Sequence, residues 1–535
     1  MAKLVGQTQP VAAGIDHNGH TMATLLGNRD KRAHCVTQPL AGQHRRLPPE
    51  QSLRVTVVGG GLAGAAAALV LAERGAHVIL HEAGPVLGGR LSSWPEQLSP
   101  GAGGDIVHIE RGFHAFFRQY YNLRNFLRRI DPELRSLRPC TDYPLFGPDG
   151  AKESFNGLPL RPPFNLLALI KRTPTISWRD LRNIDGDAAS EMLAFETNDC
   201  YERFDSMSAA EYLDRVKFPA EARLLLFEVF AHSFFNAQES MSAAEMLMMF
   251  HLYFCGSGEG ILFDVLDEPF DVAVWRPMGR LLHGLGVEVH TNSPVAAMAE
   301  PDANEAVVLA LSVEALQGVV DVNDWMRVGE KGEAWAQSVA TLRQAPPFAV
   351  LRLWLDCPVA SDRAPFAGTA GMGIIDNISV VGRYQGEARR WELDGGGSVI
   401  ELHGYALGES HAQDMEKTRA ELIRWLHHLY PETAAARILD ERFLLRRDCP
   451  SFEPGSYVHR PSVTTHHPRM MLAGDLVKLP FPTALMERAV TSGFLAANEI
   501  LCAHGVAPEP VWSIPTRGVL AGLQQWKRKM TAKGM

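Results

Sequence analysis

A glycine-rich turn early in the chain has the residue types and spacing that bind phosphate groups. The turn, Gly59-Gly60-Gly61-Leu62-Ala63-Gly64, follows an apolar, β-branched run over 54–58 and precedes an alanine-rich run. In this pattern Gly59 permits a tight turn, Gly61 lets the backbone approach a pyrophosphate, and Gly64 lets a helix pack closely on a strand. The spacing predicts a dinucleotide-binding βα connection, and the alternative is a purely structural glycine turn.

Leu62, Ala63 and Glu82 extend this signature. Leu62 and Ala63 would open the helix after the turn, where free N–H groups and the helix dipole favour phosphate oxygens. Glu82 ends the next apolar run, 77–81, and lies 18 residues beyond Gly64. A carboxylate at that point accepts hydrogen bonds from both hydroxyls of a ribose. Strand, helix and acid together therefore predict dinucleotide binding.

Two further clusters favour FAD over a nicotinamide dinucleotide. Gly88-Gly89-Arg90 offers a second glycine pair and a cation for the far side of a pyrophosphate. Much later in the chain, Gly474 and Asp475 close another apolar run, and Asp475 would bind a ribityl hydroxyl. A helix starting within 482–488, which includes Met486, would lie under a flavin ring. A nicotinamide enzyme needs none of these features.

Composition bounds the class of protein. The chain has 535 residues, of which 46% are hydrophobic and 21% charged, and it exceeds the ~250–300 residues of a single core. Disordered, collagen-like and coiled-coil classes are excluded, and the net charge of −9 argues against nucleic acid as a partner. Seven scattered cysteines without a C-x-x-C pair predict neither a disulfide framework nor a metal site. We expect a cytoplasmic protein.

The elements that must position these residues indicate an α/β fold in two domains. We expect a Rossmann-like FAD-binding domain and an inserted substrate domain, which combines helices with an antiparallel sheet predicted from the runs 348–355, 378–384 and 398–405. The predicted boundaries are a disordered leader over 1–52, an FAD-binding domain over 53–115, 277–325 and 466–510, a substrate domain over 116–276 and 326–465, and a basic amphipathic tail over 511–535.

One hexapeptide, Ser-Met-Ser-Ala-Ala-Glu, occurs twice in the predicted helical part of the insertion. It covers 206–211 and 240–245. Each copy contains a Ser-x-x-Glu capping box, the pattern that satisfies free N–H groups at a helix start. Because the flanking sequences differ, we interpret the repeat as one capping solution used twice.

Beyond these motifs, the sequence resembles a known family. The Arg111–Leu123 segment (Arg-Gly-Phe-His-Ala-Phe-Phe-Arg-Gln-Tyr-Tyr-Asn-Leu) and the 257–265 segment are similar to the carotenoid β-ring desaturase/methyltransferases, the isorenieratene synthase-like enzymes. These belong to the FAD-dependent amine oxidase and phytoene desaturase superfamily, and the resemblance covers about 53–510. It implies that Gly112 passes near the flavin and that Val295 offers its backbone to the adenine. The stretch from Val295 to the next strand is shorter than relatives usually have.

The resemblance also implies an activity, which is aromatisation of the β-ring of a carotene. Four ring hydrogens leave, and one methyl of the geminal pair migrates to the neighbouring carbon without a methyl donor. The sequence is compatible with two electron acceptors, a quinone and oxygen. The alternatives are an acyclic, phytoene-type desaturase, a flavin amine oxidase or, in a different class, a non-catalytic flavin- or lipid-binding protein of the membrane surface.

Three residues are candidates for proton transfer. His114 lies among aromatic residues just after Gly112, so it is a candidate base for a ring proton. The alternative is a structural histidine bonded to the backbone. Glu259 and Asp264 are candidates for stabilising a ring cation or accepting a proton, and each has the alternative of capping a turn.

An apolar insertion and two amphipathic segments point to a lipid-soluble substrate. The residues around 224–235 and 246–250 are more apolar than one core needs, as a tunnel for a long polyene would be. The apolar Phe164–Arg172 segment has a basic end, and the last 25 residues carry five basic and no acidic side chains. We therefore predict peripheral membrane binding, with one apolar face of the tail formed by Val519, Leu520, Leu523, Trp526 and Met530.

Overall fold

The structure is a computed structural model that describes residues 33–40, 42–140, 143–147, 150, 152–159, 161–162, 164–172, 182–224, 227 and 232–532. Residues 1–32 of the predicted leader lie outside this range, as do Leu225, Leu226 and Phe230 of the apolar insertion. None of the helices in the described ranges has both the length and the apolar character needed to cross a bilayer.

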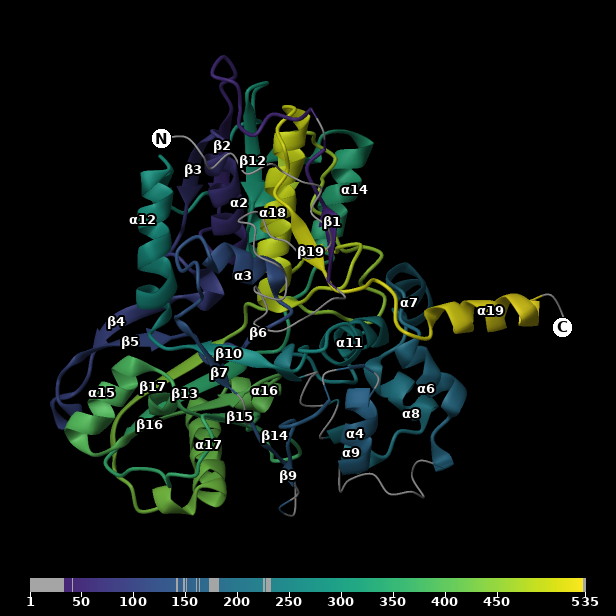
Figure 1. The fold of residues 1–535 in the computed structure, drawn as a ribbon. Coiled ribbons are helices and arrows are strands. Elements are labelled where there is room, and N and C mark those ends of the chain that lie inside the picture. Colours follow the sequence, from purple (N-terminus) through teal and green to yellow (C-terminus); the bar gives the residue numbers. More distant parts are fainter. Residues whose placement is uncertain are drawn as a thin grey trace.

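A five-stranded parallel sheet carries the glycine turn. Its strand order is β11-β3-β2-β12-β18, and every neighbouring pair is parallel. The strands are β2 (Arg54–Val58), β3 (His77–His81), β11 (Glu288–His290), β12 (Glu305–Leu309) and β18 (Met470–Leu472). Two long helices, α2 (Leu62–Glu73) and α18 (Leu485–Ala503), pack against each other beside this sheet (Figure 1).

A seven-stranded sheet forms the second layer of the molecule, below the parallel sheet in Figure 1. It is antiparallel except for the parallel pair β14–β8. Its strands in order are β17 (Ile438–Arg446), β13 (Phe348–Leu355), β16 (Ser398–Gly404), β15 (Asn377–Val380), β14 (Phe366–Thr369), β8 (Leu145–Phe146) and β9 (Lys152–Glu153). Helix α17 (Met415–Leu429) covers it by burying Leu422 and Leu426. The predicted α/β architecture with an antiparallel second sheet is confirmed.

A helical lobe lies beside this sheet, at the lower right of Figure 1. Its helices are α4 (Phe164–Arg172), α6 (Gly186–Leu193), α7 (Thr197–Phe204), α8 (Ala209–Val216), α9 (Ala220–Arg223) and α11 (Ala243–Phe250). A small antiparallel sheet joins the lobe to the rest of the protein through β6 (Phe116–Phe117), β10 (Phe263–Leu266) and β7 (Leu137–Cys140). Helix α3 (Tyr121–Leu127) follows β6 and packs on α18.

The structure departs from the predicted domain boundaries in two places. The hairpin β4 (Ser93–Gln97) and β5 (Ile106–Glu110), predicted in the FAD-binding domain, packs its Val107 and Ile109 against the seven-stranded sheet. Helix α14 (Gly329–Ala340), predicted in the substrate domain, instead packs on α13 (Val313–Val322) beside the parallel sheet. Apolar side chains on these segments fix the packing, and their sequence positions alone do not reveal it.

The ends of the described chain also differ from the prediction. Within the predicted disordered leader, β1 (His34–Thr37) pairs antiparallel with β19 (Val511–Ser513), so the leader is ordered there. The same pairing buries the start of the predicted tail, with Trp512 only 2% exposed. Only α19 (Ala521–Ala532) has the helical, amphipathic character expected of the tail. The two strands are short and far apart in sequence, which is why neither was predicted.

Only one of the two predicted capping boxes forms. Ser208 and Glu211 exchange both hydrogen bonds at the start of α8. At the start of α11 the second copy fails, because the Ser242 hydroxyl donates to Asp205 and Glu245 turns into the protein. The carboxylate of Glu245 there pairs with two buried arginines, Arg460 and Arg488.

Candidate active site

The glycine turn is built by close backbone contacts at the carboxyl end of β2. A Cβ added to Gly59 would lie 2.2 Å from the carbonyl oxygen of Ala310, and Gly59 has a φ of +108°. A Cβ on Gly64 would lie 1.9 Å from the carbonyl oxygen of Gly59. Both positions therefore require glycine for the fold itself.

Gly61 is different, because its free side faces a cavity. It is the N-cap residue of α2 with a φ of −75°, so its backbone suits any residue. A Cβ there would meet only Gly88 and Gly89, at 3.8 Å and 3.9 Å. Gly88 donates its N–H to the Gly60 carbonyl at 2.9 Å, which brings the second glycine pair beside the first. The N–H groups of Leu62 and Ala63 lie in the first turn of α2, where no intrahelical partner exists.

Glu82 lies where a ribose would be expected. Its two carboxylate oxygens accept hydrogen bonds from the N–H groups of Gly60 (2.8 Å) and Gly84 (2.7 Å). The side chain lines the cavity next to Ser293 and Val295. A carboxylate oxygen has two lone pairs, so each oxygen of Glu82 keeps one for a ligand hydroxyl.

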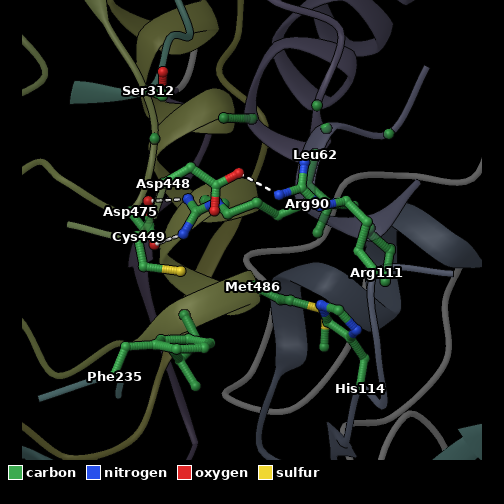
Figure 2. Close-up of a pocket in the computed structure, with 18 of the residues that line it drawn as sticks. Leu62, Arg90, Arg111, His114, Phe235, Ser312, Asp448, Cys449, Asp475 and Met486 are labelled. Atoms are coloured by element: carbon green, nitrogen blue, oxygen red, sulfur yellow. Dashed lines mark hydrogen bonds and ion pairs between the residues drawn. The ribbon is translucent and has the colours of Figure 1, made fainter. Parts of the chain in front are cut away.

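Arg90 and Asp475 lie side by side in the cavity wall, joined by an ion pair (Figure 2). The Arg90 guanidinium and the Asp475 carboxylate form a bidentate ion pair, in which Nη1 of Arg90 donates to Oδ2 of Asp475 at 2.8 Å. Burial alone would lower the pKa of Arg90, but Asp475 raises it well above its ordinary value. The predicted cation and acid thus lie at one point of the wall, and Met486 lines the same cavity (Figure 2).

All these groups line one cavity of about 750 Å³ that has two chemically different ends. The glycine turn, Glu82, Arg90 and Asp475 form the polar end at the carboxyl edge of the parallel sheet. The other end is aromatic, with walls formed by Phe113, Phe117, Tyr143, Phe155, Phe234 and Phe263. This size and lining suit a small-molecule site, and the polar end fits a dinucleotide because phosphate donors and a ribose acceptor lie in sequence along it.

His114 lines the cavity between the two ends. Its Nδ1 lies 2.9 Å from the carbonyl oxygen of Gly112, so Nδ1 carries the hydrogen and Nε2 the lone pair. Its ring packs edge-on against Phe270, at 5.3 Å between centroids. Burial lowers the pKa of His114 to about 4, so the imidazole is neutral at physiological pH. Its role as a base stays a prediction.

Glu259 and Asp264 are not among the described residues that line the cavity, although Asp264 directly follows the lining residue Phe263. Glu259 pairs with Arg118 at 3.0 Å, and Asp264 pairs with both Arg118 and Arg124. Both acids are buried, at 2% and 5% exposed. Both acids neutralise buried or half-buried arginines, and their predicted part in proton transfer stays a prediction.

Sequence reasoning missed a polar group in the aromatic wall. His403 and Tyr405 line the cavity, with Glu401 directly behind them. The residues alternate along β16 and its end, so their side chains share one face of the sheet. The sequence pattern that could have predicted this group is the placement of charged and polar residues at alternate positions of an otherwise apolar strand.

Known proteins match the chain over most of its length. Residues 62–501 match the family described as flavin containing amine oxidoreductase. The carotenoid phi-ring synthase of Streptomyces griseus is 45% identical over 511 residues, covering 93% of this chain and 96% of that protein. The carotenoid phi-ring synthase of Chlorobaculum tepidum is 26% identical over 647 aligned positions, covering 97% and 96%.

Among solved structures, the cyclohexylamine oxidase of Brevibacterium oxydans has a TM-score of 0.59 and is 14% identical. The match covers 85% of this chain and 99% of that one. At this identity the likeness concerns the fold alone.

Proposed function

The chain belongs to the flavin containing amine oxidoreductase family, and from that premise we propose that it is a carotenoid oxidoreductase that aromatises the β-ring of a carotene. The observation that carries the proposal is the single cavity, in which a dinucleotide-binding end opens directly into an aromatic end. The printed names of the two carotenoid phi-ring synthases support the choice of substrate class.

We propose FAD as the flavin. The first turn of α2 and Gly61 would hold the pyrophosphate, Glu82 the ribose and the backbone near Val295 the adenine. Arg90 and Asp475 would contact the phosphates and the ribityl chain, and Met486 would lie against the ring. Bound FAD supplies the two-electron oxidant for the reaction. Glu82 and Val295 in the cavity lining support FAD over the shorter FMN, because FMN has no adenosine for these two residues to bind.

The aromatic end favours a hydrocarbon ring over an amine. Phenylalanine and tyrosine form its walls. Of the acids among the described residues that line the cavity, Asp448 and Asp475 each pair with an arginine and Glu82 accepts from backbone N–H groups. An ammonium substrate would need a carboxylate or carbonyl cluster to offset its desolvation. The proposed reaction removes two hydride equivalents and two protons from each ring, while one methyl shifts to the adjacent carbon. The aromatic walls would hold the ring in place and exclude water from the cation formed by hydride loss.

Expression in cells that accumulate β-carotene tests this function. We expect a new carotenoid whose mass is lower by four hydrogens for each converted ring, identified by chromatography and mass spectrometry. A Gly61→Val variant expressed at the same level is the matched control. Hydrogen peroxide released from amines, with no aromatic carotenoid, would favour the amine oxidase alternative. Coloured products that form in phytoene-accumulating cells, with no new product in β-carotene-accumulating cells, would favour the acyclic desaturase.

We also propose that α4 of the helical lobe and α19, which packs on this lobe, contact a membrane, from which an apolar polyene would enter. On α4, Phe164 and Leu167 are each 59% exposed and Lys171 follows on the same face. On α19, Leu523 and Trp526 are 51% and 59% exposed. The opposite face of α19 is attached to the protein, because Arg528 pairs with Asp199 at 2.8 Å and Gln524 bonds to Ser190.

Vesicle flotation measures this contact. Full-length protein should float with anionic vesicles at low salt, and Leu523→Ser with Trp526→Ser should weaken binding about tenfold or more, since each buried apolar side chain contributes about 1.5–3 kcal/mol. Leu393→Ser is the control, because Leu393 is 78% exposed on α15 (Gly386–Gly395), away from this lobe in Figure 1. Deleting 511–535 is unsuitable because it removes buried β19. Wild-type protein that stays with the pellet fraction would contradict the proposal.

A further inference from the structure

A chain of three polar side chains runs from the interior into the aromatic end of the cavity. Tyr405 lines the cavity, and its hydroxyl lies 2.6 Å from Nδ1 of His403. The other ring nitrogen of His403, Nε2, lies 2.8 Å from a carboxylate oxygen of Glu401. His403 and Glu401 are each 1% exposed, so the chain is shielded from bulk water except at its cavity end.

The neighbours of Glu401 fix the direction in which the hydrogens point. Arg352 donates to Glu401 at 2.8 Å, and both are fully buried. Burial would raise the pKa of Glu401, but Arg352 and His403 hold it at about 2, so Glu401 is a carboxylate. A carboxylate 2.8 Å from Nε2 requires a hydrogen between them, and this outweighs the longer contact of Nε2 with the Phe113 N–H at 3.2 Å. Nδ1 is therefore unprotonated and accepts the hydrogen of the Tyr405 hydroxyl.

The Tyr405 hydroxyl is held in place but keeps one lone pair. It donates to His403 and accepts from the side-chain amide of Asn377 at 3.1 Å, and a hydroxyl has two lone pairs. The ring of Phe235 packs edge-on against the Tyr405 ring at 5.1 Å. Phe235 has a φ of +60°, a costly conformation for a bulky residue, and it lines the same cavity. Such strain is typical of functional sites.

We propose that Tyr405, backed by His403 and Glu401, is the proton acceptor for the ring, an inference that rests on the proposed aromatisation. After hydride loss and methyl migration, the ring cation has an acidic C–H bond. The electron pair of that bond becomes the new C=C bond, and its proton goes to the free lone pair of Tyr405. The hydroxyl proton of Tyr405 passes to Nδ1 of His403, and Glu401 stabilises the imidazolium. After product release the proton returns through Tyr405 to water in the cavity.

This assignment distinguishes His403 from His114. The two lie on either side of Gly112, whose added Cβ would come within 2.8 Å of the His403 ring. Among the described residues, Nδ1 of His114 bonds to the backbone carbonyl of Gly112, and the charge of Glu401 acts on this ring only through space, without a hydrogen bond. His403 contacts a carboxylate directly. A proton that reaches His403 therefore lies within hydrogen-bond distance of a carboxylate, which a proton on His114 does not.

The test compares Tyr405→Phe, His403→Gln and the double variant during turnover of the full-length, FAD-loaded protein with β-carotene and a quinone. The quinone reoxidises the flavin, because each ring releases four electrons and one FAD accepts two. Each single variant should retain FAD and slow formation of the aromatic product by about 10²- to 10⁴-fold. The double variant should be no slower than the singles, because both changes interrupt one proton path. Tyr212→Phe is the control, since Tyr212 is a buried tyrosine bonded to the Ala188 carbonyl outside the cavity.

Solvent deuterium provides a readout that a structural role would not change. Wild-type product formation should be slower in D₂O, because the Tyr405 hydroxyl exchanges with solvent, and Tyr405→Phe should abolish the difference. A Tyr405→Phe variant that forms product at the wild-type rate would overturn the proton path alone. So would a double variant whose rate is lowered by the product of the two single-variant effects. Wild-type protein that forms no aromatic ring would overturn the proposed function and this path together.

Discussion

Purified Gly61→Val protein is expected to be folded and colourless. The valine side chain projects into the cavity where the backbone must approach a pyrophosphate, and the φ of −75° imposes no strain on it. We expect flavin binding at least about 100-fold weaker, which corresponds to about 3 kcal/mol. The flavin absorbance of the purified protein, before and after added FAD, measures the effect.

Two further glycine variants distinguish loss of flavin binding from loss of stability. Gly279→Val is the matched control, because an added Cβ on Gly279 in α12 (Arg276–Gly284) has no neighbour within 4 Å. It should bind flavin like the wild type. Gly59→Ala should lower stability instead, since its Cβ would lie 2.2 Å from the carbonyl oxygen of Ala310. Flavin-bound Gly61→Val protein would place the pyrophosphate elsewhere and contradict the site.

The Glu245→Gln variant is expected to lose about 3–5 kcal/mol of folding free energy. The change removes the charge that offsets Arg488 and Arg460, all three being almost fully buried, and leaves two uncompensated cations in the interior. The Tyr201 hydroxyl also donates to Glu245 at 2.6 Å. Urea denaturation at pH 7, followed by the shift of the midpoint, measures the loss.

The duplicated hexapeptide supplies a matched control for this variant. Glu211 occupies the same place in the first copy but is exposed and caps α8. Glutamine serves equally well at that capping position, so Glu211→Gln should change stability by no more than about 0.5 kcal/mol. Equal effects of the two substitutions would contradict the assignment of Glu245 as a buried counter-ion.

The effect of Glu245→Gln should also depend on pH. Burial raises the pKa of Glu245, but Arg488 and Arg460 outweigh burial and lower it from 4.5 to about 2. A lowered carboxyl pKa contributes stability above the unfolded pKa and loses it as the pH falls through the folded value. The difference between wild type and variant should therefore be complete at pH 7 and shrink between pH 4.5 and pH 2. A difference that grows on acidification would be evidence against this ion pair.

The polar end of the cavity could be predicted because its signals are local. The glycine turn, the helix start and Glu82 belong to one βα unit, whose geometry follows from sequence spacing. The parallel sheet and the antiparallel sheet were likewise legible from apolar runs. In contrast, β1 and β19 stabilise each other across almost the whole chain, and no local pattern predicts such a pairing.

The roles of charged residues could not be predicted because their partners are distant in sequence. Glu245 has the sequence of a capping residue, but Arg460 and Arg488 arrive more than 200 residues later and bind it. Asp264 is neutralised by Arg124, 140 residues earlier. Glu401 depends on Arg352 from the neighbouring strand, a consequence of the β13–β16 register. Each outcome is decided by tertiary packing.

The central claim is that FAD at the polar end oxidises a carotene ring at the aromatic end, and one anaerobic experiment tests it most directly. Purified, FAD-loaded protein is mixed with β-carotene in vesicles, and flavin absorbance and carotenoid products are followed together. Because each ring releases four electrons and each FAD accepts two, we expect two flavins to be bleached for every aromatic ring formed. Gly61→Val protein should show neither bleaching nor product. Flavin that stays oxidised with β-carotene but bleaches with a simple amine would contradict the claim.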